Sequence, residues 1–115
     1  MKTEPEDSYK YATILAALVV PCPRGAVRIK SSTIKDLPIT NISYLHSLTD
    51  QAVAIAAYER LRSFFATKIM SEIVIGDEYY IGKEVQTDER ILEIIKCSLQ
   101  TMWHAACTCK DGEGG

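Results

Sequence analysis

Residues 49–69, TDQAVAIAAYERLRSFFATKI, decide the fold class, because they are the most regular stretch of the chain. Apolar side chains recur there at three- and four-residue steps, the spacing of one helix face. They are Val53, Ala57, Leu61, Phe64 and Phe65. Thr49 is a suitable N-cap, and Asp50 in the first turn complements the helix dipole. The opposite face carries Glu59, Arg60 and Lys68. An amphipathic helix over residues 50–69 is therefore predicted.

A second amphipathic helix is expected from Thr87 to about Trp103. Thr87 can cap it, and Asp88 and Glu89 suit the positive end of its dipole. Its apolar stripe is formed by Ile91, Ile95, Leu99 and Met102, with Leu92 and Ile94 widening it. We expect this stripe to pack on a sheet. Residues 70–86, punctuated by two glycines, are typical of a structured loop.

The region before the first helix predicts strands. Residues 11–20, YATILAALVV, are apolar and rich in strand formers, and the prolines at 21 and 23 prevent a helix from continuing, so a buried strand is expected. Arg24 and Gly25 would form a turn. Residues 26–31 alternate between apolar and basic side chains, as in a strand with one wet face. These two strands would form a hairpin, followed by a loop and a possibly extended stretch at 39–44.

Together these elements predict an α+β fold. The expected architecture is a partial antiparallel sheet, made of the hairpin and one or two further strands, with the two amphipathic helices packed on one face. A chain of 115 residues, 47% of them hydrophobic, is the size of one domain and is expected to bury roughly two-thirds of its unfolded surface. Residues 1–10 are expected to be a disordered tail, residues 11–110 the domain, and residues 111–115 a flexible tail.

Charge and cysteine content exclude several classes of partner. Thirteen basic and fifteen acidic residues are spread without a basic block, which argues against nucleic acid. The apolar run at 11–20 is half the roughly twenty residues needed to span a bilayer, and an acidic leader precedes it, so neither a membrane span nor a secretory signal is expected. Reduced thiols in a cytoplasmic protein are the favoured interpretation of the four cysteines.

The C-terminal stretch TMWHAACTCKDGEGG concentrates the reactive side chains. Cys97, His104, Cys107 and Cys109 could in principle bind zinc, although the Cys-x-Cys spacing is unlike the usual knuckles, and no metal site is predicted. A Cys–His nucleophile pair would lack an orienting third group. A catalytic base at His104 remains open beside a simply packed histidine. The other histidine, His46, is expected on the surface.

Five ordered pieces of the sequence resemble one enzyme family. They are the Arg-Gly-x-Val at residues 24–27, the Asp-Leu-Pro-Ile at 36–39, the Thr-Asp-Gln at 49–51, the Gly-Asp-Glu-Tyr at 76–79, and the Trp-His-x-x-x-Thr-Cys at 103–109. In this order and spacing, from about Tyr11 to Lys110, the chain resembles the C-terminal substrate-binding part of the glucose-methanol-choline oxidoreductases, fungal alcohol-oxidising branch.

The resemblance implies a flavin-dependent activity. In that family FAD accepts a hydride from an alcohol carbon while a histidine takes the hydroxyl proton, and His104 matches that histidine. Trp103 and His104 would lie beside the isoalloxazine ring. The implied partners are a small-molecule alcohol and either a complementing flavin-binding domain or a second copy of the chain. The alternative is a non-catalytic interaction or dimerisation module descended from such an enzyme.

The chain departs from the family pattern at several points. It has no glycine fingerprint of a Rossmann domain, and Lys110 to Gly112 replace the expected methionine and glycine. Ile42 and Leu48 stand where prolines are common. The region that supplies the second His or Asn of the catalytic pair is also absent. These departures predict a truncated relative that is inactive alone, because the cofactor carries the hydride chemistry.

Overall fold

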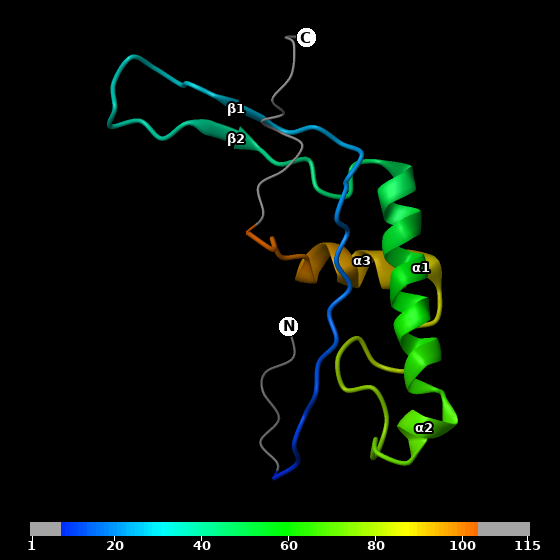
Figure 1. Ribbon diagram of the computed structural model, residues 1–115. Coiled ribbons are helices and arrows are strands. Elements are labelled where there is room, and N and C mark those ends of the chain that lie inside the picture. The colour runs from blue at the N-terminus through cyan, green and yellow to red at the C-terminus, as the bar shows by residue number, and fades with distance from the viewer. Residues whose placement is uncertain (1–7, 104–115) are drawn as a thin grey trace.

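The computed structural model describes residues 8–103 and contains two short strands and three helices (Figure 1). The elements in chain order are β1 Ala26–Arg28, β2 Ile39–Asn41, α1 Leu48–Phe65, α2 Lys68–Ser71 and α3 Asp88–Ser98. The α+β class with an antiparallel sheet is confirmed. Of the tails expected at residues 1–10 and 111–115, residues 1–7 and 111–115 lie outside the described residues, as does the extended character expected after Trp103.

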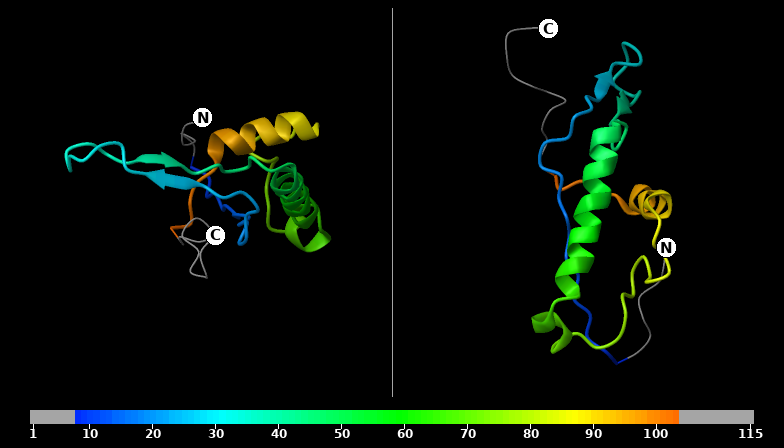
Figure 2. Two further views of the ribbon diagram at one scale, coloured as in Figure 1. Left: turned by 90° about the horizontal axis from the view of Figure 1, so that it is seen from above. Right: turned by 90° about the vertical axis from the view of Figure 1, so that its right-hand side faces the viewer.

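The sheet is a two-stranded ribbon. β1 and β2 pair antiparallel, with Ala26 opposite Asn41 and Arg28 opposite Ile39. The ribbon projects away from α1 and α3 (Figures 1 and 2), and it forms no contacts with the helices. The alternation at residues 26–31 therefore predicted a strand correctly, and the stretch from Ile39 is extended as expected. The predicted pairing partner for β1 was wrong, because β2 takes the place assigned to residues 11–20.

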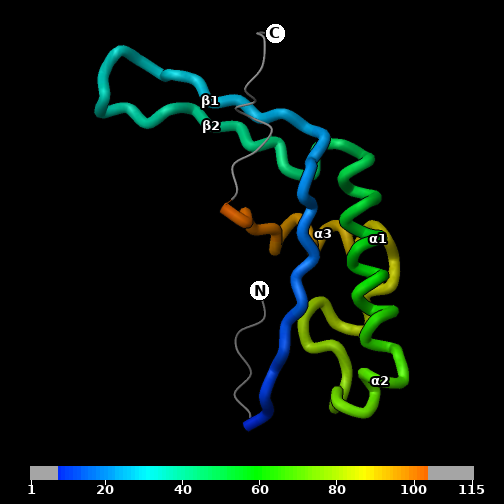
Figure 3. The backbone as a smooth tube through the Cα atoms, viewed as in Figure 1, coloured from blue at the N-terminus to red at the C-terminus, as the bar shows by residue number. Residues whose placement is uncertain are grey.

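Residues 11–20 form a solvent-exposed segment that is extended as far as residue 18 and bends at residues 19 and 20 (Figure 3). Within the described part of the chain, no residue from 12 to 20 makes a backbone hydrogen bond, so the prediction of a buried strand was wrong. The physical reason is non-local: strand propensity becomes a strand only when a neighbour supplies the ladder hydrogen bonds. The segment is held at its ends, where the Tyr11 ring packs edge-on against Tyr79 at 5.4 Å and the Cys22 N–H donates to Asp50.

The bend after this segment lies earlier than predicted. The chain bends at residues 19, 20 and 22, not at Arg24 and Gly25. Arg24 instead secures the bend, because its Nη1 donates to the carbonyl oxygens of Pro21, Cys22 and Pro23 at 2.9, 3.1 and 3.3 Å. Proline has no backbone N–H, so Pro21 and Pro23 cannot donate hydrogen bonds in this bend. The Arg24 guanidinium supplies N–H donors to the three carbonyl oxygens instead.

The helix α1 begins at Leu48, two residues earlier than predicted. Ser47, rather than Thr49, is its N-cap, and the Ser47 hydroxyl accepts from the Thr49 N–H at 3.2 Å. The helix ends at Phe65, and Lys68 and Ile69 lie in the separate short α2. Asp50 does lie in the first turn, but it is only 2% exposed, and both of its carboxylate oxygens accept from the Cys22 N–H at 3.1 Å.

The inward face of α1 also differs from the predicted stripe. Val53 and Phe64 are exposed, whereas a half-buried face runs through Gln51, Ile55, Tyr58, Leu61, Arg62 and Phe65. This face has the same three- and four-residue spacing but includes two polar side chains that find partners in the 76–85 loop. Burial was thus decided by hydrogen bonding as much as by hydrophobicity.

The helix α3 confirms the predicted cap and corrects the predicted packing. Thr87 caps it, accepting from the Arg90 N–H at 3.4 Å, and the helix ends at Ser98, five residues before Trp103. Leu99 and Met102 are therefore outside the helix and exposed. The stripe packs on α1, not on a sheet, and Ile91, 1% exposed, is its most buried member.

The buried core is small for a chain of this size. Among the described residues, only Leu45, Val85 and Ile91 are buried apolar side chains. The accessible surface is 10294 Å², against about 6,300 Å² for a compact monomer of this mass. The expectation that two-thirds of the unfolded surface would be buried was therefore wrong, because the 11–20 segment is exposed and the ribbon does not pack on the helices.

Candidate functional site

Trp103 is the one predicted site residue that the structure describes. It follows α3 after a short non-helical stretch, and its side chain is 89% exposed. Its backbone N–H donates to the Thr101 Oγ1 at 3.2 Å. The predicted proton acceptor, His104, is the next residue and lies outside the described part of the chain. The structure thus places the indole in solvent at the end of the α3 segment.

The backbone at Trp103 is strained. Its φ is +61°, in the left-handed region that non-glycine residues avoid at a cost of about 1–2 kcal/mol. The Thr101 hydroxyl stabilises the turn that leads into this conformation. Such outliers are a reason to look for function, because strain of this kind concentrates at active sites and ligand contacts. Ser43, Leu45 and Ile81 share this conformation, with φ of +55°, +52° and +71°, so the strain does not by itself single out Trp103.

Arg62 of α1 holds the loop that leads into α3. Its Nη1 donates to the Val85 carbonyl at 2.6 Å and its Nη2 donates to the Gly82 carbonyl at 3.0 Å. Its Nε pairs with the Glu78 carboxylate at 2.9 Å. A planar guanidinium can satisfy three acceptors in fixed directions, which an ammonium group cannot. Arg62 therefore fixes the path of the chain just before α3 begins.

Tyr58 completes this clamp. It lies one turn before Arg62, its hydroxyl donates to the second oxygen of the Glu78 carboxylate, and the Arg62 guanidinium lies 4.6 Å from its ring centroid. Burial, and then the hydrogen bond and negative charge of Glu78, raise the pKa of the Tyr58 phenol well above its usual value near 10. The phenol consequently keeps its proton, and its role as a donor, under alkaline conditions.

The raised pKa of Tyr58 predicts a specific loss of stability at high pH. Below pH ~10 the phenol is neutral in both states; above it the unfolded phenol loses its proton while the folded one keeps it. Stability is therefore full below the unfolded pKa and falls as pH rises toward the folded pKa. We expect Tyr58→Phe to lose about 1 kcal/mol at neutral pH and to remove this alkaline slope.

The measurement is urea unfolding of the parent chain and of Tyr58→Phe, each at neutral pH and above pH ~10. The difference in unfolding free energy between the two proteins at each pH gives the contribution of the phenol. Tyr44→Phe, which removes an exposed phenol from the loop before α1, controls for the loss of a hydroxyl as such. An alkaline slope of equal size in Tyr58→Phe and the parent chain would contradict the role assigned to this phenol.

The clamp and the buried aspartate were not identified from the sequence. Nothing in the residue pattern distinguishes Arg62 from the neighbouring Arg60, and Asp50 was expected only to complement the helix dipole. The signal available was position: Asp50, Tyr58, Leu61 and Arg62 share the half-buried face of α1. A polar side chain on a half-buried face requires a hydrogen-bond partner, and that requirement could have singled out Asp50 and Arg62.

The cysteines and histidines of the described region do not form a metal site. Within residues 8–103, no group of three His, Cys, Asp or Glu side chains is placed to hold an ion. Cys97 is an exposed free thiol, and Cys107 and Cys109 lie outside the described residues. His46 is exposed, as predicted. Cys22 is also exposed and free, and the adjacent Asp50 carboxylate raises the pKa of its thiol, which disfavours the reactive thiolate.

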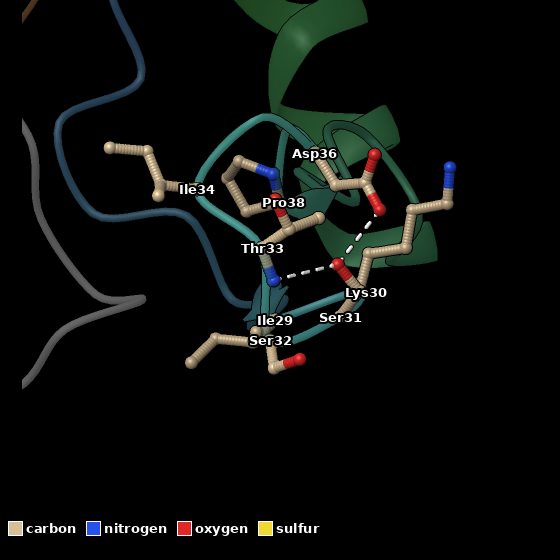
Figure 4. Close-up of a pocket in the computed structure, with 8 residues that line it drawn as sticks. All are labelled: Ile29, Lys30, Ser31, Ser32, Thr33, Ile34, Asp36 and Pro38. Carbon is tan, nitrogen blue, oxygen red and sulfur yellow. Dashed lines mark hydrogen bonds between the residues drawn. The ribbon is translucent and has the colours of Figure 1, made fainter.

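A hollow of about 490 Å³ lies in the loop between β1 and β2 (Figure 4). Its polar groups already bond one another: the Ser31 hydroxyl donates to the Asp36 carboxylate at 2.8 Å and accepts from the Thr33 N–H at 3.2 Å. The other lining residues are Ile29, Lys30, Ser32, Ile34 and Pro38. The hollow is therefore a feature of the turn, and it contains no residue predicted to be catalytic.

The described residues fit only part of a flavin. An exposed indole at Trp103 offers a planar surface for the isoalloxazine ring. The phosphates of FAD require backbone N–H groups at a glycine-rich turn, and the sequence contains no G-x-G-x-x-G. The described residues therefore offer a surface for the flavin ring but no glycine-rich turn of this kind for its phosphates.

None of the helices within residues 8–103 is long and apolar enough to cross a membrane.

Comparison with known proteins gave a consistent family signal. The family model described as GMC oxidoreductase matches residues 21–114. Patulin synthase from Aspergillus clavatus is 37% identical over 113 residues, which are 98% of this chain and 18% of that protein. Patulin synthase from Penicillium expansum is 38% identical over 112 residues, with 97% and 18% covered.

A third relative has a different name but similar coverage. Versicolorin B synthase from Aspergillus parasiticus is 36% identical over 107 residues, which are 93% of this chain and 17% of that protein. The chain thus spans less than a fifth of the length of the curated relatives that it matches.

Proposed function

Because the chain belongs to the GMC (glucose-methanol-choline) oxidoreductase family, we propose that it is the substrate-binding portion of an FAD-dependent alcohol oxidoreductase. The match over residues 21–114 carries this proposal, since it includes the Trp-His pair and the four other motifs that precede it. The substrate class is a small-molecule alcohol, and the reaction converts its CH–OH group to a carbonyl.

In this proposal His104 is the proton acceptor. FAD, when bound, supplies the acceptor for the hydride that leaves the alcohol carbon. The neutral imidazole of His104 takes the hydroxyl proton, and an ordinary histidine pKa near 6.5 makes it a competent base at neutral pH. Proton removal raises the electron density on the alcohol oxygen, which makes loss of hydride easier. Trp103 would offer its exposed indole to the isoalloxazine ring.

The architecture supports a positioning role for the described part of the chain. Arg62 holds the loop before α3, Ile91 packs α3 on α1, and the segment after α3 ends at Trp103. Trp103 therefore follows, after a short non-helical stretch, a helix whose start and packing face are both fixed. The cofactor cradle, however, would come from a complementing flavin-binding domain, so we propose that the isolated chain does not oxidise alcohols.

A chimera tests this function directly. The matching segment of the Penicillium expansum patulin synthase would be replaced by this chain, and anaerobic flavin reduction by the host enzyme's substrate would be followed by absorbance. We expect the chimera to bind FAD and reduce it, and the 115-residue chain with added FAD to give no alcohol-dependent reduction. A folded, flavin-loaded chimera that fails to reduce its flavin would contradict the proposal.

The unusually large exposed surface favours a second candidate function, association through non-catalytic contacts.

A further inference from the structure

The last residue of β2 begins a short motif that the proposed function does not use. Asn41, the only asparagine of the chain, is followed by Ile42 and Ser43. Asn-x-Ser, with any residue except proline in the middle, is the acceptor pattern for N-linked glycans. Ile42 stands where the family pattern commonly has proline, which would prevent the modification. The motif is therefore a feature of this chain rather than of the family.

The hydrogen bonds of the Asn41 side chain leave its amide nitrogen free to react. The Oδ1 atom accepts from the Ser43 N–H at 3.2 Å and from the Ser43 hydroxyl at 3.0 Å. A backbone N–H can only donate, so these contacts fix which end of the amide is oxygen and which is nitrogen. Among the described residues, nothing accepts a hydrogen bond from Nδ2. The two side chains that the motif requires therefore lie in direct contact, and the nitrogen that would carry a glycan has no competing partner.

The surroundings of Asn41 have room for a bulky group. The residue is exposed, and the ribbon that carries it projects away from α1 and α3 and forms no contacts with them (Figures 1 and 2). Its backbone pairs with Ala26, and a side chain on a strand stands away from the ladder, so a substituent on Nδ2 leaves this pairing intact. Ile39, on the same face and 56% exposed, would be shielded by a hydrated sugar. The fold thus accepts a glycan here without moving any element.

We propose that Asn41 accepts an N-linked glycan from a lipid-linked oligosaccharide pyrophosphate. Its Nδ2 attacks the anomeric carbon of the first sugar, and the bond from that carbon to the pyrophosphate oxygen breaks. The lipid pyrophosphate leaves with the electron pair, and one Nδ2 proton passes to a base of the transferase, so nothing is oxidised or reduced. This modification is separate from the oxidoreductase function and does not depend on any flavin.

The modification places the polypeptide in the secretory pathway, where this acceptor pattern is used. The cytoplasmic location favoured from the sequence rests on the cysteines and on residues 1–20 of a chain that spans less than a fifth of its relatives. The two expectations exclude each other for the mature protein. A glycan on Asn41 would therefore reject the cytoplasmic location.

The direct test is made on the protein isolated from the cells that produce it. Trypsin cuts after Lys35 and Arg60, so Asn41 lies on the peptide 36–60. We expect mass spectrometry to find this peptide only after treatment with an amidase that removes N-glycans and converts the asparagine amide to a carboxylate. Recovery of most of the peptide in unmodified form from the untreated protein would overturn the proposal.

Variants of the full chain, secreted from a eukaryotic host behind a cleavable leader, test each residue of the motif. We expect the parent chain to carry a glycan, and Asn41→Gln, Ile42→Pro and Ser43→Ala to lower its occupancy roughly tenfold or more. Ser32→Ala, at an exposed serine of the β1–β2 loop, is the matched control for Ser43→Ala and should keep the glycan. Ser43→Thr should also keep it, because threonine supplies the same hydroxyl.

Circular dichroism of the secreted chain tests the placement of the site. The glycosylated chain and the same chain after enzymatic removal of the sugar should have equal helical signals, because the ribbon makes no contact with the helices. A parent chain secreted without a glycan, a glycan that persists in Asn41→Gln, or a helical signal that is lost on glycosylation would each contradict the assignment.

Discussion

We expect His104→Asn, made in the chimera described above, to slow flavin reduction by roughly 10²- to 10⁴-fold, the usual contribution of a positioned general base. Asparagine can keep a hydrogen bond to the alcohol but cannot accept its proton at neutral pH. The loss should appear in the rate of reduction rather than in the flavin content. The measurement is single-turnover reduction under anaerobic conditions, with flavin content quantified in the same sample.

The other histidine provides the matched control. His46 is exposed in the loop before α1, so His46→Asn should leave the reduction rate unchanged. A lost base also changes the pH profile: the rise in rate through the histidine pKa near 6.5 should disappear in His104→Asn alone. Equal rates in His104→Asn and the parent chimera would exclude His104 as the proton acceptor.

The second large effect concerns stability. Ile91, 1% exposed between α3 and α1, is the most buried apolar side chain of the described fold. We expect Ile91→Ala to destabilise the chain by about 3 kcal/mol, because truncation removes three buried carbons and leaves a cavity. With only Leu45 and Val85 also buried, little stability remains to absorb this loss. Urea unfolding followed by circular dichroism should show a much lower midpoint or no cooperative transition.

Ile34→Ala is the matched control, because it makes the same isoleucine-to-alanine truncation at an exposed position. Ile34 is 98% exposed at the end of the ribbon, so the same truncation should change the unfolding free energy by less than about 0.5 kcal/mol. Similar midpoints for the two variants would mean that α3 does not pack on α1 through Ile91.

Local signals allowed the helices to be predicted well. The Thr87 cap of α3, the acidic first turn at Asp88 and Glu89, and the ribbon strand at residues 26–28 all depend on neighbours within a few positions. The boundaries were less accurate. Ser47 caps α1 in place of Thr49, because both residues have suitable side chains and only the geometry of the preceding loop selects one.

Non-local choices could not be predicted from the same patterns. Residues 11–20 have strong strand propensity, but whether they become a strand depends on a partner elsewhere. The stripe of α3 identifies an apolar face without identifying what covers it, and here α1 does so instead of a sheet. The errors at residues 11–20 and at α3 have the same cause. Periodicity in the sequence identifies the apolar face of an element but not the element that packs against it.

The candidate site was predicted only in part. Resemblance singled out Trp103 and His104, and the structure adds that Trp103 is 89% exposed with a left-handed backbone, a conformation it shares with Ser43, Leu45 and Ile81. The Arg62, Tyr58 and Glu78 clamp was missed, because it joins residues up to 23 positions apart through a loop with no regular pattern. Hydrogen bonds across such distances follow from the fold rather than from spacing.

The exposed 11–20 segment also has a consequence for how long the chain survives in a cell. Proteases cleave extended backbone that fits their clefts, and a stretch of ten residues with no ladder bonds needs no unfolding first. The same apolar residues suit chaperones that bind unfolded chains. We therefore expect the steady-state abundance of this polypeptide to follow the availability of whatever covers residues 11–20.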